Sequence, residues 1–318
     1  MFAESVGSPG LWLGFTLFVL ALLALDLGVF HRRPHAVSIR EALVWSSIWI
    51  ALAGVFNVFV YAWFGPTRGL EFLTGYLIEK ALAVDNIFVF AIIFSYFAVP
   101  PVYQHRVLFW GILGALLLRA IFIILGAVLL QKFHWIMYVF GGFLIFTGFK
   151  LLVQKEGEIH PERNPVLRAF SRMIPAVAEY QDGRFFVVKS RRRYATPLLL
   201  VLVSVEFTDV VFALDSIPAI FAVTSDPFIV YTSNVFAILG LRSMYFLLAG
   251  VIYKFHYLKI GLALVLAFVG AKMVLAEIYK IPIAVSLAVI ATLIMGSVVV
   301  SLWRPQKNSG NQMTAADN

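Results

Sequence analysis

The chain has 318 residues, of which 61% are hydrophobic and 13% are charged, so it carries more apolar surface than a soluble domain of this size could bury. This composition predicts an integral membrane protein. A formal net charge of +8 could suggest a nucleic-acid partner, but the basic residues are placed as in a membrane protein with cytoplasmic loops. The sequence has no cysteine, which excludes disulfides, thiolate metal sites and thiol redox chemistry.

Apolar runs long enough to cross a bilayer as helices recur along the chain. About nine are predicted, at residues 10–30, 41–64, 70–97, 106–130, 135–153, 197–223, 228–253, 257–278 and 282–303. The first eleven residues contain no lysine or arginine, and no cleavage site clearly follows the first run, so that run is expected to remain as a span. The predicted fold is all-α, a polytopic membrane bundle forming a single transmembrane domain over residues 1–303.

Basic residues gather on one side of this predicted bundle. If the N-terminus is outside, the opposite, cytoplasmic side receives Arg32, Arg33, Arg40, Arg106, Lys254, Lys259, Arg304, Lys307 and the linker 154–196. The outer side receives only Arg68, Lys132 and Lys280. By the positive-inside rule, the C-terminus is therefore predicted to be cytoplasmic. The bilayer is the expected partner, and nucleic acid is not.

Two polar segments lie outside the predicted spans. The linker 154–196 is interrupted by Pro161, Pro165 and Pro175, ends in the basic run 191–193, and could hold one short amphipathic helix at 165–179. The segment 304–318 is polar and rich in small residues, so it is expected to be a disordered cytoplasmic tail.

The sequence contains a predicted internal repeat, with copy A at about 70–153 and copy B at about 197–278. An acid, five residues, an aspartate, a small polar residue and an isoleucine occur in each copy, from residue 79 and from residue 209. Arg119 and Arg242 follow in the next span of each copy, and Lys150 and Lys272 in the span after that. The two copies would begin on opposite sides of the membrane. Such inverted repeats are typical of alternating-access transporters, which bind their substrate near the midplane.

Five carboxylates fall inside predicted spans, where each charge costs roughly 2.5–3.5 kcal/mol on insertion scales. They are Glu79, Asp85, Glu206, Asp209 and Asp215. With the Asn86 amide and the Ser216 hydroxyl they offer only oxygen ligands, which suit Mn²⁺, Mg²⁺ or Ca²⁺ better than Zn²⁺ or Cu⁺. The six histidines all lie at predicted membrane edges or in loops, so none is a candidate for this site. The same acids could also bind a proton, and cation/proton antiport would use both properties.

Two questions about these acids remain open: whether they are paired with buried bases, and whether Asp209 and Asp215 can face the same site. The acids could instead form internal ion pairs with Arg119, Arg242, Lys80 and Lys272, which would hold helices together. Asp209 and Asp215 are six positions apart, so one regular helix would separate them by about 120°. Pro218 lacks a backbone donor, and we therefore expect a helix break near 215–218 that turns both acids inward.

The segments 79–86 and 206–218, together with the stretch around Arg242, strongly resemble the TerC family of bacterial membrane proteins, closest to its Alx branch. The resemblance covers residues 11–303. It implies an inner-membrane protein of about nine spans, connected with tellurite resistance and manganese export. In such a membrane the outer N-terminus expected from the basic residues is periplasmic. It also implies that the five acids form the cation site, with Asn86 and Ser216 in the same motifs. The family's older label, redox modulator, finds no cysteine, haem motif or flavin motif to support it.

Three classes of function follow. The first is an exporter of Mn²⁺ that could be coupled to protons and needs no resident cofactor. The second is a membrane scaffold or stress-resistance protein without transport activity, whose basic linker would contact partners. The third, a membrane enzyme using paired carboxylates, lacks a recognisable nucleophile or metal-binding histidine motif, so no enzyme activity is expected.

Overall fold

The computed structural model describes residues 5–25, 37–133, 135–153, 177, 180–181, 183–189, 192–249 and 257–303. These residues form ten helices and one two-stranded hairpin. The helices are α1 (Pro9–Leu25), α2 (Ile39–Phe64), α3 (Pro66–Tyr96), α4 (Pro101–Lys132), α5 (Ile136–Val153), α7 (Pro197–Phe221), α8 (Pro227–Leu239), α9 (Leu241–Leu248), α10 (Leu258–Leu275) and α11 (Ile283–Trp303). The strands are β1 (Phe186–Lys189) and β2 (Arg192–Ala195).

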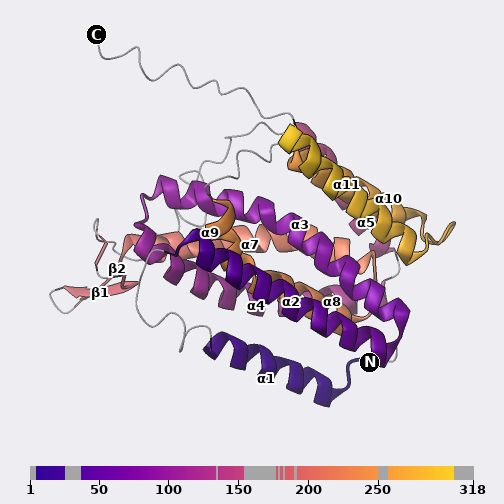
Figure 1. Ribbon diagram of the computed structural model, residues 1–318, viewed down its shortest axis with the longest axis horizontal. Coiled ribbons are helices and arrows are strands. Elements are labelled where there is room, and N and C mark those ends of the chain that lie inside the picture. Colours follow the sequence, from indigo (N-terminus) through magenta and orange to yellow (C-terminus); the bar gives the residue numbers. More distant parts are fainter. Residues whose placement is uncertain are drawn as a thin grey trace, which may run out of the picture.

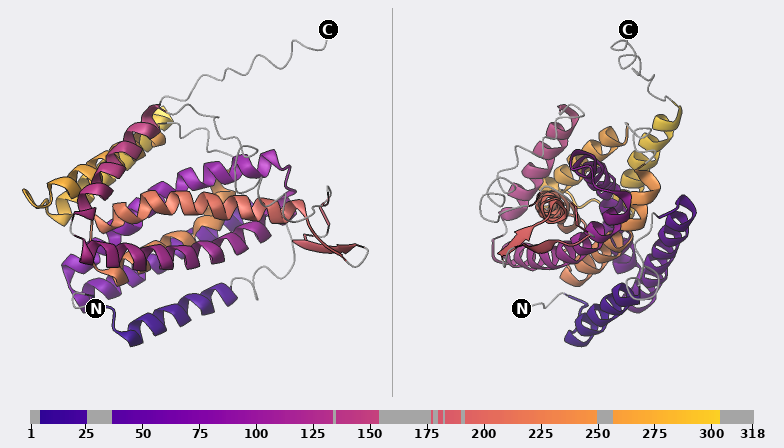
Figure 2. Two further views of the ribbon diagram at one scale, coloured as in Figure 1. Left: turned by 180° about the vertical axis from the view of Figure 1, so that it is seen from behind. Right: turned by 90° about the vertical axis from the view of Figure 1, so that its left-hand side faces the viewer.

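The helices form two groups (Figure 1). Helices α2, α3, α4, α7, α8 and α9 make an inner group, in which α3 packs on α8 and α4 packs on α7. Helices α5, α10 and α11 make an outer group, which contacts the inner group mainly through α3 and α7. Two further views show the same separation, with α1 along one edge and the hairpin at one end (Figure 2).

The described helices bear out a helical integral membrane protein. Six of them, α2, α4, α5, α7, α10 and α11, are long and apolar enough to cross a membrane. Helix α3 has 31 residues but includes five charged ones, while α1 and α8 are shorter, with 17 and 13 residues. Large apolar side chains such as Val55, Phe146 and Met295 are exposed on the outside, where lipid would contact them. A total of nine spans stays a prediction.

Proline marks the beginning of many of these helices. The first position of a helix needs no backbone donor, so proline fits there without losing a hydrogen bond. Helices α1, α3, α4, α7 and α8 all begin at a proline. Side chains cap the starts of two helices. At α2, Ser38 Oγ accepts a hydrogen bond from Glu41 N, and at α8, Asp226 Oδ1 accepts one from Phe228 N.

The expected helix break near Pro218 was wrong. Helix α7 continues through Pro218 to Phe221, and Pro218 is buried inside it. Only the donor to the Leu214 carbonyl is missing there, and the surrounding packing tolerates that single loss. The described part of the seventh predicted span is broken instead, at Gly240 between α8 and α9. A Cβ atom at Gly240 would lie 2.6 Å from Lys80 Nζ and 3.3 Å from Trp49 Cβ, so these side chains fill the break.

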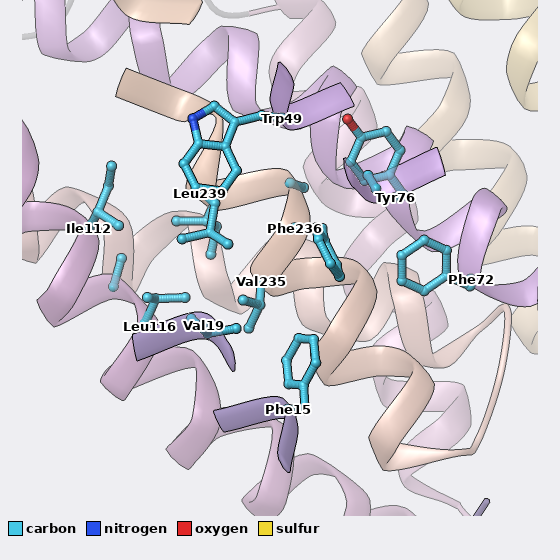
Figure 3. Close-up of a cluster of buried hydrophobic side chains, with 14 of the residues drawn as sticks. Phe15, Val19, Trp49, Phe72, Tyr76, Ile112, Leu116, Val235, Phe236 and Leu239 are labelled. Atoms are coloured by element: carbon cyan, nitrogen blue, oxygen red, sulfur yellow. The ribbon is translucent and has the colours of Figure 1, made fainter. Parts of the chain in front are cut away.

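An aromatic and aliphatic cluster holds the inner group and α1 together (Figure 3). Phe15 of α1 and Phe236 of α8 lie with their ring centroids 5.9 Å apart. Phe72 of α3 lies 6.0 Å from Phe236 in an edge-on arrangement. Ile112 and Leu116 of α4 complete the cluster. It fixes α3, α4 and α8 relative to one another, and these are three of the four helices that carry the site.

Glycines bring α5 and α10 into backbone contact. A Cβ atom at Gly270 would lie 2.6 Å from the Gly141 carbonyl oxygen, and one at Gly148 would lie 2.7 Å from the Ala263 carbonyl oxygen. Small residues at such positions let helices approach closely within a membrane. Because the obstacle is backbone, a side chain there cannot be accommodated by a rotamer change.

We therefore expect Gly270→Ala to lower the free energy of unfolding by about 1–3 kcal/mol, the usual cost of overpacking. The matched control is Gly142→Ala on α5, where a new Cβ atom would meet nothing within 4 Å. Alanine is the better helix former, so the control should be neutral or slightly stabilised. Thermal unfolding of both purified variants in the same detergent measures the difference, and equal midpoints would contradict the packing argument.

The linker contains secondary structure that an all-α prediction did not include. Strands β1 and β2 pair antiparallel, with Phe186 opposite Ala195 and Lys189 opposite Arg192. The hairpin is held against the bundle by Thr196, whose hydroxyl donates to the Arg184 carbonyl at 2.6 Å. The predicted helix at 165–179, except for residue 177, lies outside the described residues, and so does the predicted tail at 304–318. Five of the six histidines also lie outside them: His31, His35, His134, His160 and His256.

Candidate functional site

A buried arginine lies at the centre of the inner group. The guanidinium of Arg119, on α4, forms an ion pair with Glu79 of α3, and its Nη2 lies 3.5 Å from Asp209 Oδ1 of α7. Its Nη1 also donates to Ser216 Oγ at 3.0 Å and to Asn234 Oδ1 of α8 at 3.2 Å. All five residues are at most 3% exposed. The network therefore connects four helices without contact with bulk water.

Helical spacing explains which predicted residues take part. Glu79 and Asn86 are seven residues apart on α3, and Asp209 and Ser216 are seven apart on α7. Seven residues are close to two turns, so each pair lies along one face of its helix. Asn86 is buried with Glu79 on the inner side, and its Oδ1 atom has no hydrogen-bond partner among the described residues.

Glu206 lies one turn before Asp209 and faces α4. Its carboxylate occupies the space that a side chain at Gly114 would take. Glu206 Oε2 and Asp209 Oδ2 are both buried and have no hydrogen-bond partner among the described residues. Asp209 and Arg242 also line a narrow cavity between α3, α4, α7 and α9. The inner group therefore contains a small cavity and, among its described residues, buried carboxylate oxygens without a hydrogen-bond partner.

Asp85 and Asp215 lie apart from this network. Six residues separate Asp85 from Glu79, which places the two about 120° apart around α3. Asp85 is acted on by the charge of Lys259 on α10, and Asp215 by that of Lys150 on α5. Asp215 Oδ1 also accepts a hydrogen bond of 3.1 Å from Thr147 of α5. Both aspartates therefore face the outer group.

The seven predicted ligands are thus divided between two faces. Glu79, Asn86, Asp209 and Ser216 lie in the inner group with Glu206 beside them, while Asp85 and Asp215 lie at the contact with the outer group. Within the part of the chain that the structure describes, no three acidic or histidine side chains come close enough together to hold a metal ion. In this conformation, Arg119 supplies the positive charge between the carboxylates.

Asn234 and Thr147 contact predicted ligands but were not among the predicted site residues. Asn234 Nδ2 donates to Glu79 Oε2 at 3.2 Å. The repeat could not have indicated it, because the position matching Asn234 in copy A is Leu108. A single polar residue in a span more often makes a packing hydrogen bond, so sequence alone gave it little weight.

A second polar network lies at the end of the bundle where α3 begins. It connects the N-terminal segment with the start of α3. Asp226 accepts hydrogen bonds from Ser5 Oγ at 2.9 Å and from Val6 N at 2.8 Å. Thr224 donates to Glu71 at 2.7 Å, and Glu71 forms an ion pair of 2.8 Å with Arg68. These contacts fix the α7–α8 connection to the beginning of α3.

Residues 64–309 match the model of the family described as integral membrane protein TerC. The chain belongs to the TerC family. It is 60% identical over 298 residues to "Uncharacterized membrane protein STKORF319" of Myxococcus xanthus, covering 94% of this chain and 93% of that protein. It is 50% and 49% identical over 309 residues to proteins named "Putative membrane-bound redox modulator Alx" from Salmonella typhi and Escherichia coli K12, covering 94% of this chain and 96% of each relative. No solved structure matches it.

These matches confirm the TerC resemblance and its Alx branch. They span both predicted copies of the repeat and all seven predicted site residues. They also place the chain among multi-pass membrane proteins with bacterial relatives. Two of these relatives are named as redox modulators and none of the three names mentions an ion, so the choice of substrate rests on the chemistry of the site.

Proposed function

We propose that this TerC-family protein exports a divalent cation, Mn²⁺, across the bacterial inner membrane, and that the inner carboxylates bind it. The observation that carries this proposal is a pair of buried carboxylate oxygens, Glu206 Oε2 and Asp209 Oδ2, that have no partner among the described residues. Asp209 also lines a small cavity inside the membrane bundle. A membrane interior strongly disfavours such groups unless they serve an ion pathway. Oxygen ligands from Glu79, Asn86, Glu206, Asp209 and Ser216 suit a hard divalent cation.

The helix packing supports the inverted repeat that alternating access would use. If α3 corresponds to α7 and α4 to α8, then exchanging the two copies converts the α3–α8 contact into the α7–α4 contact, and both contacts exist. Helices α5 and α10, which correspond in the same way, pack on each other. The cation would then bind between the two copies, as in other inverted-repeat transporters.

Asp85 and Asp215 take a separate role in this proposal. Each occupies the equivalent position in its copy and faces the outer helices rather than Arg119. We assign these two aspartates to the proton that would be exchanged for the cation, or to a later step in which the outer helices shift. This assignment keeps all seven predicted residues in one transport cycle.

The charge distribution favours a periplasmic N-terminus. The starts of α2 and α4, which carry Arg40 and Arg106, lie at the end of the bundle with the hairpin, which itself carries Arg193, whereas the start of α3 and the end of α4, which carry Arg68 and Lys132, lie at the other end (Figure 1). The positive-inside rule assigns the hairpin end to the cytoplasm. Ser5 and Val6 contact Asp226 at the opposite end, which is then periplasmic.

The test measures total manganese in bacterial cells that lack their own exporter. Cells expressing the wild-type chain should contain less manganese, whereas cells expressing Asp209→Asn should not, because the amide cannot supply the charge. Glu277→Gln is the matched control, since it changes a carboxylate that contacts Tyr138 at the bundle end. If the wild-type protein reaches the membrane but leaves manganese, magnesium and calcium unchanged, the exporter proposal fails and the scaffold hypothesis takes its place.

A further inference from the structure

Arg119 occupies the space between the two acids that the repeat places at equivalent positions. Glu79 precedes Asp85 by six residues, and Asp209 precedes Asp215 by six residues. The guanidinium contacts one oxygen of each, through Nη1 to Glu79 Oε1 and Nη2 to Asp209 Oδ1. Arg119 is also among the largest side chains that are fully buried.

The charges of this group are not balanced when all three side chains are ionised. One guanidinium carries +1 and two carboxylates carry −2, which leaves a net charge of −1. A divalent cation would neutralise the same two carboxylates, and the displaced guanidinium would then leave the group with a net charge of +1. A guanidinium and a metal ion cannot occupy the same carboxylate oxygens, so the two compete for one position.

The guanidinium has other acceptors within reach. Arg119 Nη1 already donates to Ser216 Oγ and Asn234 Oδ1, both neutral, at 3.0 and 3.2 Å. Asn234 Nδ2 holds the second oxygen of Glu79, so that carboxylate stays oriented if the arginine leaves it. The second oxygen of Asp209 has no partner among the described residues. Small movements could therefore exchange the arginine for a cation while its Nη1 keeps two hydrogen-bond acceptors.

We propose that Arg119 is a built-in competitor of the transported cation, an inference that rests on the proposed function. In the ion-free state its guanidinium neutralises Glu79 and Asp209. The arriving cation displaces it toward Ser216 and Asn234, and its return to the carboxylates helps to expel the cation on the other side. Arg119 is thus a positioning residue that sets cation affinity and release, in addition to linking helices.

The experiment compares Mn²⁺ affinity with transport rate in the full-length protein reconstituted in lipid. Mn²⁺ binding is followed by electron paramagnetic resonance, and transport by Mn²⁺ flux into proteoliposomes. Removing a competing charge-assisted contact in Arg119→Gln should tighten Mn²⁺ binding by about tenfold or more. Transport should become slower, because the cation is no longer expelled. A purely structural arginine would give weaker binding and slower transport together.

Two further variants make the result decisive. In Arg119→Lys the charge remains, but the ammonium cannot bridge both carboxylates as the planar guanidinium does, so affinity should lie between those of wild type and Arg119→Gln. Arg68→Gln removes a positive charge at the bundle end and should leave Mn²⁺ affinity unchanged. If either Arg119 variant folds and binds Mn²⁺ no more tightly than wild type, the competition is overturned; if Arg119→Gln does not fold, Arg119→Lys decides. A wild-type protein that neither binds nor transports Mn²⁺ overturns the proposed function itself.

Discussion

Replacement of Glu79 by alanine is expected to lower the free energy of unfolding by about 3–5 kcal/mol, the usual cost of removing one member of a buried ion pair. Glu79 is 1% exposed, forms an ion pair with Arg119 and accepts a hydrogen bond from Asn234. Its removal leaves the guanidinium with the more distant Asp209 and leaves the Asn234 amide without its acceptor. Thermal unfolding in detergent, with membrane expression measured alongside, gives the effect.

A double variant separates the structural from the functional part of this effect. A buried ion pair replaced by apolar side chains of similar volume is often neutral in stability. Glu79→Leu with Arg119→Met should therefore recover most of the lost stability, yet transport no manganese. If Glu79→Ala alone unfolds at the wild-type temperature, the central network contributes little to folding. If the double variant transports manganese normally, Glu79 is not a ligand.

A single methyl group at Gly114 should reduce transport by about tenfold or more, since small displacements of a functional group carry penalties of this size. A Cβ atom there would overlap the carboxylate of Glu206. That carboxylate is the end of a flexible side chain, so it can move away at little cost in folding energy. The expected result for Gly114→Ala is therefore slow Mn²⁺ flux in proteoliposomes with a nearly unchanged unfolding temperature.

The matched control is Gly54→Ala on α2, where a Cβ atom would meet nothing within 4 Å. This variant should transport at the wild-type rate. Gly114→Ala combined with Glu206→Ala tests the cause, because the overlap is removed but the ligand is lost, so transport should stay low. Wild-type flux in Gly114→Ala would show that the position of Glu206 does not matter.

The helical membrane fold and the candidate residues could be predicted because both leave a pattern in the sequence. Apolar runs predict helices that cross a membrane, and acids within such runs are rare. The seven-residue spacing of Glu79 to Asn86 and of Asp209 to Ser216 was available too, and it already divides the predicted ligands between two helix faces. Treating all five acids as one cluster ignored that spacing.

Other features depend on contacts that sequence patterns do not encode. Proline at residue 218 suggested a break, but one missing donor does not end a helix that its neighbours support. At the actual break, Gly240, the space that a side chain would take is filled by Lys80 of α3 and Trp49 of α2. In the same way, Arg119 was recognised as a possible ion-pair partner, but its four acceptors come from three other helices, α3, α7 and α8.

The contacts of Asp226 have a practical consequence for experiments on this protein. Ser5 and Val6 are bonded to the carboxylate that also caps α8, so the chain is part of the folded structure from Ser5 onward. A fluorescent protein or affinity tag fused directly ahead of Ser5 would strain this attachment and disturb the start of α8. A reporter fused to the N-terminus therefore needs a flexible spacer. Without the spacer, the tag itself could lower activity, and the loss would be mistaken for evidence against transport.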